Sequence, residues 1–187
     1  GNISYRLHAA EAFRALGCGV VLFDYRGYGR SQGTPSEEGL YRDAEAVWTH
    51  LTHLVPPDRI VIMGESLGGG VATYLAERNP PAGLILQSTY TSLPELASEL
   101  YPMIPSQLCR FRFPSRDRIA RISCPKLVMH GRADEVIPYH HGRVLYEAAA
   151  EPRRFVELPG GHNDDPFTAE VSRQLDAFLS ECSLSAP

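Results

Sequence analysis

The chain has 187 residues, of which 43% are hydrophobic and 21% are charged, and its formal net charge is -4 at pH 7. This length predicts a single domain spanning residues 1–187, and the mild acidity argues against a nucleic-acid partner, because such proteins need a concentrated positive field. No apolar run approaches the ~20 residues of a membrane helix, so we expect no segment that spans a bilayer.

Strand-like and helix-like segments alternate along the chain. In chain order we expect a helix at 4–16, a strand at Gly19–Asp24, a helix at Ser36–Leu54, a strand at Arg59–Met63, a helix at Leu67–Arg78, strands at Gly83–Gln87 and Lys126–His130, a helix at Tyr139–Ala150, a strand at Arg154–Leu158 and a helix at Asp165–Leu179. This alternation predicts an α/β fold, with a mostly parallel sheet and helices on both faces. In such sheets, functional residues gather at the carboxyl ends of the strands.

One segment, at about 89–123, interrupts the alternation. It is rich in proline, aromatic residues and arginine, and it follows a predicted strand at the edge where function gathers. A stretch of this length at that edge is typical of a short lid or binding loop. The alternative is a helical excursion that only packs on the surface.

The cysteines, Cys18, Cys109, Cys124 and Cys182, are widely spaced and form no zinc-binding pattern, so we expect no metal. The favoured interpretation is free thiols in a reducing compartment, and disulfides in a secreted form are the alternative. No targeting signal follows Gly1, so we expect a cytoplasmic protein, and a segment before Gly1 that targets or anchors it is an open alternative. The sequence leaves the oligomeric state open.

A tight turn follows the strand predicted at Arg59–Met63. Its sequence, Gly-Glu-Ser-Leu-Gly at 64–68, matches the G-x-S-x-G pattern of a nucleophile elbow. The pattern alone is weak, but a strand directly before it and a small-residue helix directly after it strengthen it. The tightness of the turn predicts that both flanking positions must be glycine. We therefore expect Ser66 to be a nucleophile, and the alternative is a glycine-rich turn with an incidental serine.

A serine nucleophile needs a general base, which in turn needs an orienting acid. Asp134 comes just after the strand predicted at Lys126–His130, and His162 comes just after the strand predicted at Arg154–Leu158. These positions predict Asp134 as the acid and His162 as the base. The rival candidates are His8, His50, His53, His130, His140, His141, Asp24 and Asp117.

Five stretches resemble the α/β-hydrolase superfamily, and within it the subgroup of the fission-yeast morphology hydrolase and the animal hydrolases that remove palmitate from proteins. They are DYRGYGRSQGTPSEEGLYRDA, GESLGGGVATYLA, STYTSL, CPKLVMHGRADEVIP and GGHND. The resemblance implies the same roles for Ser66, Asp134 and His162, and hydrolysis of an ester, thioester or amide without a cofactor. The segment around 94–121 matches only loosely, so the resemblance does not extend to a substrate.

The opening residues GNIS resemble the end of a family stretch that follows the third strand of the fold and carries one oxyanion donor. In the family's sheet, that strand lies between the strands predicted here at 19–24 and 59–63. The resemblance therefore implies a chain that corresponds to the C-terminal two-thirds of the fold and lacks its N-terminal strands. We expect the backbone N–H of Leu67 to be the other oxyanion donor.

Together these features predict a serine hydrolase that cleaves an acyl ester or thioester through an acyl-enzyme intermediate. We expect a small-molecule or lipid-like acyl substrate, and no cofactor. The residues expected to line its acyl pocket flank the strand ends: Tyr90, Leu93, Tyr101, Met103, Val136 and Ile137. For each of them, a place in the core is the alternative. A peptidase of the same fold and a non-catalytic binding protein remain open as rival functions.

Overall fold

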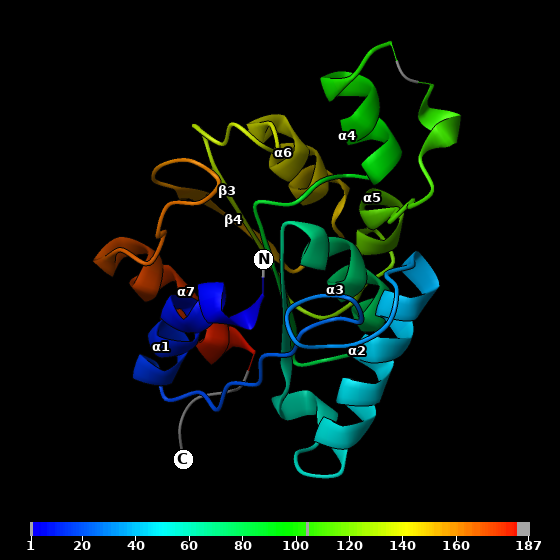
Figure 1. Cartoon of the computed structure of the whole chain (residues 1–187). Coiled ribbons are helices and arrows are strands. Elements are labelled where there is room, and N and C mark those ends of the chain that lie inside the picture. The colour runs from blue at the N-terminus through cyan, green and yellow to red at the C-terminus, as the bar shows by residue number, and fades with distance from the viewer. Residues whose placement is uncertain (1, 104, 183–187) are drawn as a thin grey trace.

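The computed structural model describes residues 2–103 and 105–182, and its centre is a parallel sheet of four strands (Figure 1). The strands are β1 (Val61–Glu65), β2 (Gly83–Gln87), β3 (Lys126–Gly131) and β4 (Arg153–Leu158), and they lie side by side in that order. The register pairs Glu65 with Gln87 and Gly131 with Leu158. All four carboxyl ends therefore meet at one edge of the sheet.

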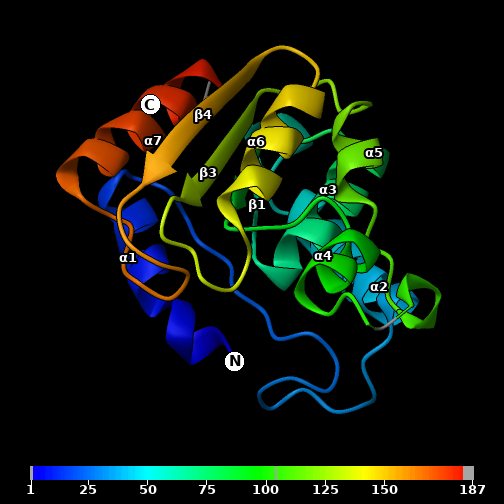
Figure 2. The ribbon, with the colours of Figure 1, turned by 90° about the horizontal axis from the view of Figure 1, so that it is seen from above.

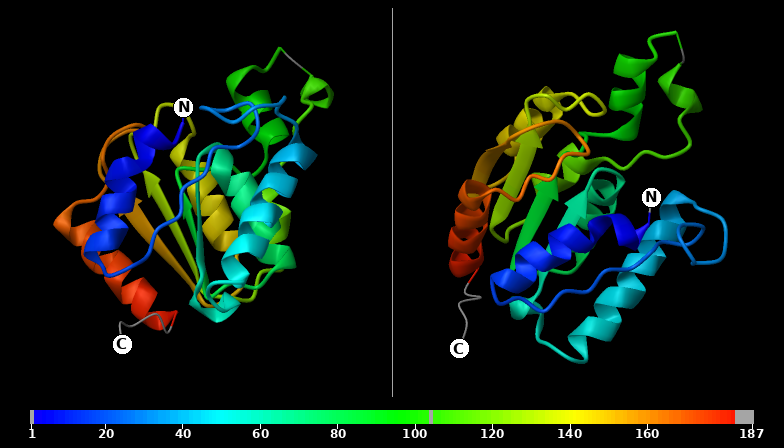
Figure 3. Two further views of the ribbon diagram at one scale, coloured as in Figure 1. Left: turned by 60° about the horizontal axis from the view of Figure 1, so that its bottom comes forward. Right: turned by 60° about the vertical axis from the view of Figure 1, so that its left-hand side comes forward.

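Helices cover both faces of the sheet (Figures 2 and 3). They are α1 (Leu7–Ala15), α2 (Glu37–Thr52), α3 (Leu67–Arg78), α4 (Leu93–Leu100), α5 (Ser115–Ile119), α6 (Tyr139–Ala148) and α7 (Ala169–Glu181). Short 3₁₀ turns lie at Ile3–Arg6, Pro57–Arg59 and Ser106–Leu108. One apolar core joins the sheet to α2, α3, α5 and α6, and a second joins its other face to α1 and α7. The predicted α/β class, with helices on both faces, is confirmed.

The strand predicted at Gly19–Asp24 is wrong for the residues described. This segment runs without regular secondary structure, and Val21 is 56% exposed. A strand exists only where a neighbour completes its backbone hydrogen bonds, and no described residue lies in register between this segment and β1. Phe23 and Tyr25 still pack against the core, edge to face with ring centroids 5.1 Å apart.

The remaining elements follow the predicted order, with shifts at their ends. The bounds of α3 and β2 are those predicted, and Ser36 caps α2 by accepting a hydrogen bond from the Gly39 N–H. The last helix begins later than Asp165, because Thr168 is the residue whose side chain accepts from the Val171 N–H.

The segment at about 89–123 contains α4, the 3₁₀ turn at Ser106–Leu108 and α5. Helix α5 packs against α3 and α6, whereas α4 and the turn after it project from the body of the protein (Figures 1 and 3). The segment thus has two parts: the packed helix α5, and a projecting arm that we define as residues 93–103 and 105–108.

All four cysteines are free thiols. Every helix within the described part of the chain is too short or too polar to cross a bilayer.

Helix α3 lies unusually close to its neighbours because its first turns carry glycine. A Cβ on Gly69 would sit 2.1 Å from Thr89 Oγ1, and one on Gly70 would sit 2.5 Å from the Phe113 Cβ. Phe113 is fully buried, so its ring has no free space into which it could move. These two glycines therefore set how closely α3 approaches the segment that follows β2.

Gly70→Ala should destabilise the fold by about 1–3 kcal/mol, because the added methyl group overlaps the Phe113 side chain in a close-packed core. Gly68→Ala is the matched control, since a Cβ there meets only Tyr25 Oη at 3.7 Å. In a helix, that control should be neutral or stabilising by up to about 1 kcal/mol. Urea unfolding measures both changes, and equal effects would show that the Phe113 contact does not limit this packing.

Candidate active site

Ser66 lies in a strained turn between β1 and α3. Its backbone has φ 51° and ψ -119°, a region that residues other than glycine rarely adopt. The Ser66 N–H donates to the Gln87 carbonyl at 3.0 Å, and Thr89 Oγ1 donates to the Ser66 carbonyl at 2.7 Å. These bonds hold the strained residue and leave its hydroxyl at the carboxyl edge of the sheet.

The prediction that both positions flanking the elbow must be glycine is only half right. A Cβ on Gly64 would lie 2.5 Å from the Gly68 carbonyl oxygen, so this position has no room for a side chain. Gly68 itself has ordinary space around it, with its nearest neighbour at 3.7 Å. The close approach falls instead on Gly69 and Gly70, where the helix meets Thr89 and Phe113.

The structure brings Ser66, His162 and Asp134 together from three strand ends. His162 Nε2 lies 3.1 Å from Ser66 Oγ, and His162 Nδ1 lies 2.8 Å from Asp134 Oδ2. The carboxylate accepts a hydrogen bond from the Nδ1–H, which leaves the lone pair of Nε2 facing the serine hydroxyl. This arrangement can take a proton from Ser66 and hold it on the imidazole.

Asp134 is a buried carboxylate surrounded by donors. Its Oδ1 accepts from the N–H groups of Val136 at 3.0 Å and Ile137 at 2.8 Å. Burial alone raises the pKa of the Asp134 carboxyl, but hydrogen bonds from His130, His162 and the two backbone N–H groups outweigh it, and the pKa lies well below its usual range. The side chain therefore stays charged at neutral pH.

The loop that carries His162 is fixed by acidic side chains. Glu135 Oε2 accepts from the His162 N–H at 3.1 Å, and Asp164 Oδ2 accepts from the Gly161 N–H at 2.7 Å. Gly160 has φ 81°, which places it in the left-handed region that favours glycine. Asp164 therefore closes this loop.

The backbone N–H of Leu67 lies at the start of α3, directly after Ser66. The first N–H groups of a helix have no intrahelical acceptor, and the helix dipole adds partial positive charge there. Leu67 thus lies at a helix N-terminus, and its role as a donor to a developing oxyanion stays a prediction.

The six residues predicted to line an acyl pocket do not converge on one cavity. Tyr90 and Ile137 belong to the core, and Tyr90 Oη donates to the Leu67 carbonyl at 3.2 Å. Leu93 is half-buried against that core, and Val136 is exposed. Tyr101 and Met103 lie on the projecting arm, where Met103 is 93% exposed.

Two hollows on the protein surface lie away from Ser66. One, of about 430 Å³, is lined by Glu45, Trp48, Thr49, Arg78 and Asn79. The other, of about 260 Å³, lies at the base of the projecting arm and includes Thr91, Glu95 and Arg116. The acyl pocket therefore stays a prediction.

His130, one of the rival candidates for the base, contacts the predicted acid instead. Its ring is fully buried, and its Nε2–H donates to the Ile137 carbonyl at 2.8 Å. The same nitrogen lies 3.3 Å from Asp134 Oδ2. His130 lies at the end of β3 and Asp134 follows that strand closely, so the shared strand end is the sequence signal that could have linked them. The other rival acids lie elsewhere: Asp24 Oδ1 accepts from the Ile3 N–H at 2.9 Å, and Asp117 is exposed on α5.

Glu65, beside the elbow, pairs with the N-terminal part of the chain. Arg6 Nε lies 2.9 Å from Glu65 Oε2, and the Glu65 side chain is only 13% exposed. Burial raises the pKa of Glu65, and the nearby charge of Arg6 opposes this rise. This contact holds the 3₁₀ turn at Ile3–Arg6 beside Glu65, at the carboxyl edge of the sheet (Figure 3).

Known proteins share this sequence pattern. Residues 4–115 match the family described as serine aminopeptidase, S33. An uncharacterised protein of Mycobacterium tuberculosis is 43% identical over 190 residues, which cover 98% of this chain and 68% of that protein. The human alpha/beta hydrolase domain-containing protein 17B is 36% identical over 169 residues, which cover 89% of this chain but only 58% of the human protein.

Solved structures share the fold at lower identity. Est1E from Butyrivibrio proteoclasticus, solved with ferulic acid bound, has a TM-score of 0.82 at 20% identity, covering 98% of this chain and 85% of Est1E. A monoacylglycerol lipase from Paleococcus ferrophilus has a TM-score of 0.71 at 19% identity, covering 98% and 91%. These likenesses establish the α/β-hydrolase fold.

Asp134 should make stability depend on pH at the acid end. Its folded-state pKa lies below the unfolded value of about 3.9, so its contribution is present above that value and is lost as pH falls through the folded pKa. Asp134→Asn removes this titration. The stability advantage of the parent over the variant, measured by urea unfolding, should shrink between about pH 5 and about pH 3. A constant difference would mean that folding does not favour the ionised carboxyl.

Proposed function

The chain belongs to the α/β-hydrolase family described as serine aminopeptidase S33, and we propose that it is a serine hydrolase that cleaves an acyl ester or thioester. One observation carries the proposal: an unbroken series of contacts runs from Asp134 through His162 to the strained Ser66. A structural turn has no need for a buried, charged acid aligned with a histidine and a serine. Backbone strain at such a turn is typical of functional sites.

In the proposed reaction, His162 Nε2 accepts the proton of Ser66 Oγ while that oxygen attacks the acyl carbonyl carbon. Asp134 holds the imidazole in the tautomer that makes this transfer possible and stabilises the imidazolium that forms. The 3.1 Å separation of Nε2 and Oγ already lies within hydrogen-bond reach. His130 acts only through Asp134, whose Oδ2 lies 3.3 Å from His130 Nε2.

The negative charge of the tetrahedral intermediate develops on the former carbonyl oxygen, beside the start of α3. The Leu67 N–H donates to this oxygen. The intermediate collapses as the C–O or C–S bond breaks, and the imidazolium returns its proton to the leaving alcohol or thiol. Water, deprotonated by the same imidazole, then attacks the acyl-enzyme and releases the carboxylic acid and Ser66.

The projecting arm supports a lipid-like acyl substrate. Tyr101, Met103 and Leu108 expose large apolar side chains on it, although such surface is normally kept from water. We assign the segment at about 89–123 as a lid whose arm contacts the acyl chain. Leu93 and Val136, at the base of the arm and beside the acid loop, are the predicted residues best placed to contact the acyl group near its carbonyl.

Peptide hydrolysis is the second candidate, because the description of the matching family names an aminopeptidase. An aminopeptidase binds the free amino group of its substrate, for which a carboxylate is the natural partner. Glu65 is occupied by Arg6, and Glu135 accepts from the His162 N–H, so both acids nearest the site are already engaged. This favours an ester or thioester over a peptide.

Ser66→Ala should lower the hydrolysis of a short nitrophenyl ester by about 10⁴-fold or more, because nucleophile and base act as a unit. It should also abolish covalent labelling by a fluorophosphonate. Ser180→Ala, an exposed serine on α7, is the matched control and should retain both properties. A folded Ser66→Ala chain that keeps most of its rate would assign the nucleophile elsewhere. A parent chain that is never labelled would favour the non-catalytic alternative.

A substrate panel separates the two enzymatic candidates. The chain should hydrolyse acyl esters and thioesters with a kcat/KM at least about tenfold above that for amino-acid nitroanilides, the value that corresponds to about 1.4 kcal/mol of transition-state binding. Steady-state rates on matched acyl groups provide the measurement. Preference for the nitroanilide with a free amino group, lost on acetylation of that group, would support the aminopeptidase instead.

A further inference from the structure

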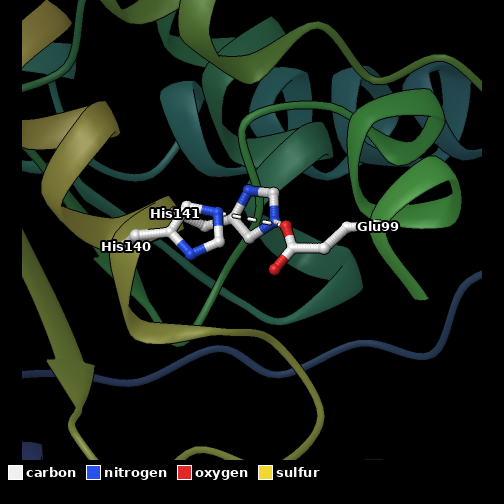
Figure 4. A group of neighbouring side chains, drawn as sticks. All are labelled: Glu99, His140 and His141. Atoms are coloured by element: carbon white, nitrogen blue, oxygen red, sulfur yellow. Dashed lines mark ion pairs between the residues drawn. The ribbon is translucent and has the colours of Figure 1, made fainter.

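A cluster of three possible metal ligands lies outside the proposed triad. Glu99, in the last turn of α4, meets His140 and His141, the second and third residues of α6 (Figure 4). Glu99 Oε2 lies 3.1 Å from His140 Nε2 and 3.3 Å from His141 Nε2. One possible ligand atom from each residue lies within 4.8 Å of the ligand atoms of the other two residues.

These separations suit a tetrahedral cation. With Zn–N and Zn–O bonds of about 2.0–2.1 Å, two corners of a tetrahedron lie about 3.3–3.4 Å apart. The two distances from Glu99 are close to that edge. His140 is exposed, so its ring can turn to shorten the third edge. Two imidazoles and one carboxylate, with a water in the fourth position, form a common ligand set for zinc.

His141 carries an independent sign that something is missing from this cluster. Its side chain is only 3% exposed, and its Nε2 has no hydrogen-bond partner within the described residues. The Glu99 carboxylate is near, but its direction does not satisfy a hydrogen bond to that nitrogen. A buried polar atom left in this state is costly, and Nε2 faces the position that a shared cation would occupy.

Thr91 contacts the opposite nitrogen of the same ring, and one of the two tautomers that these contacts allow suits metal binding. Thr91 Oγ1 lies 2.9 Å from His141 Nδ1 and can accept its hydrogen, which leaves the Nε2 lone pair free. In the other tautomer, Nδ1 accepts from the Thr91 N–H at 3.3 Å and can accept from the Thr91 hydroxyl at 2.9 Å, but the buried Nε2 then carries an unpartnered N–H. A cation on Nε2 resolves this conflict in favour of the first tautomer.

We propose that Glu99, His140 and His141 bind a zinc-type divalent cation that ties the projecting arm to α6. The site contains two imidazoles, so it selects Zn²⁺ and its nitrogen-binding neighbours over Mg²⁺ and Ca²⁺, which prefer oxygen ligands. The cation takes no part in the proposed hydrolysis, whose groups lie at Ser66, His162 and Asp134. Its role is to link α4 to α6.

Binding can be measured directly with the metal alone. Titration of the chain with Zn²⁺ against a chromophoric chelator should give about one tight site per chain. His140→Ala and Glu99→Gln should each weaken it by at least about tenfold, the lower end of what a lost supporting contact costs a metal site. His50→Ala and Glu95→Gln are the matched controls, an exposed histidine on α2 and the carboxylate one turn earlier on α4, and both should bind as the parent does.

Cobalt tests the ligand identity. Co²⁺ in this site should show the intense visible bands of tetrahedral coordination without thiolate charge transfer, because no cysteine belongs to the cluster. Thr91→Val, which removes only the hydroxyl that supports His141, should weaken Zn²⁺ binding by about 10–100-fold while the far-UV circular dichroism stays that of the parent. This variant keeps the proposal testable if changes at the buried His141 prevent folding.

The coupling to the arm has its own measurement. Zn²⁺ should slow amide hydrogen exchange in α4 and raise the melting temperature of the parent, and it should do neither in His140→Ala. The proposal is wrong if the parent binds no Zn²⁺, if His140→Ala and Glu99→Gln bind as tightly as the parent, or if Ca²⁺ competes equally. It is equally wrong if both variants lower the melting temperature in metal-free buffer while Zn²⁺ adds nothing, since the cluster would then be an ion pair only.

Discussion

The arrangement of side chains at the carboxyl edge of the sheet depends on one buried charge, the carboxylate of Asp134. A charge removed from water is stable only where donors replace the water. Two backbone N–H groups donate hydrogen bonds to Oδ1 of Asp134, and the rings of His130 and His162 lie against Oδ2. The contact that compensates the charge also fixes the ring of His162, so stability and the orientation toward Ser66 depend on one arrangement.

Close packing of α3 maintains the strain at Ser66. Non-glycine residues at positive φ cost about 1–3 kcal/mol each and persist only where their surroundings determine them. Phe113, at φ 41°, lies against Gly70, and Thr89 lies against Gly69 and bonds the Ser66 carbonyl. The elbow is thus supported from the segment after β2 rather than by its own turn alone.

Sequence reasoning located Ser66, Asp134 and His162 because each follows an apolar run closely, and such runs in parallel sheets end at one edge. It could not separate a paired strand from an unpaired extended segment at 19–24, because the apolar run does not reveal whether a neighbour exists. Nor does apolar composition distinguish Tyr90 in the core from Met103 on the surface. The cluster on α4 and α6 escaped notice because tertiary packing alone brings Glu99 to residues some forty positions away.

The projecting arm joins the body of the protein where the segments at 91–93 and 112–116 lie side by side, and we call this junction the neck. The Leu93 N–H donates to the Arg112 carbonyl and the Arg116 N–H to the Thr91 carbonyl, each at 3.0 Å. These bonds fix the base of the arm and lie at the opposite end of α4 from Glu99, whose carboxylate makes the contact with α6. Thr91 belongs both to the neck and to the support of His141, and it follows β2, whose last residue, Gln87, accepts the Ser66 N–H. A ligand bound to the cluster would therefore stiffen the arm and the strand end behind the elbow through the same residue.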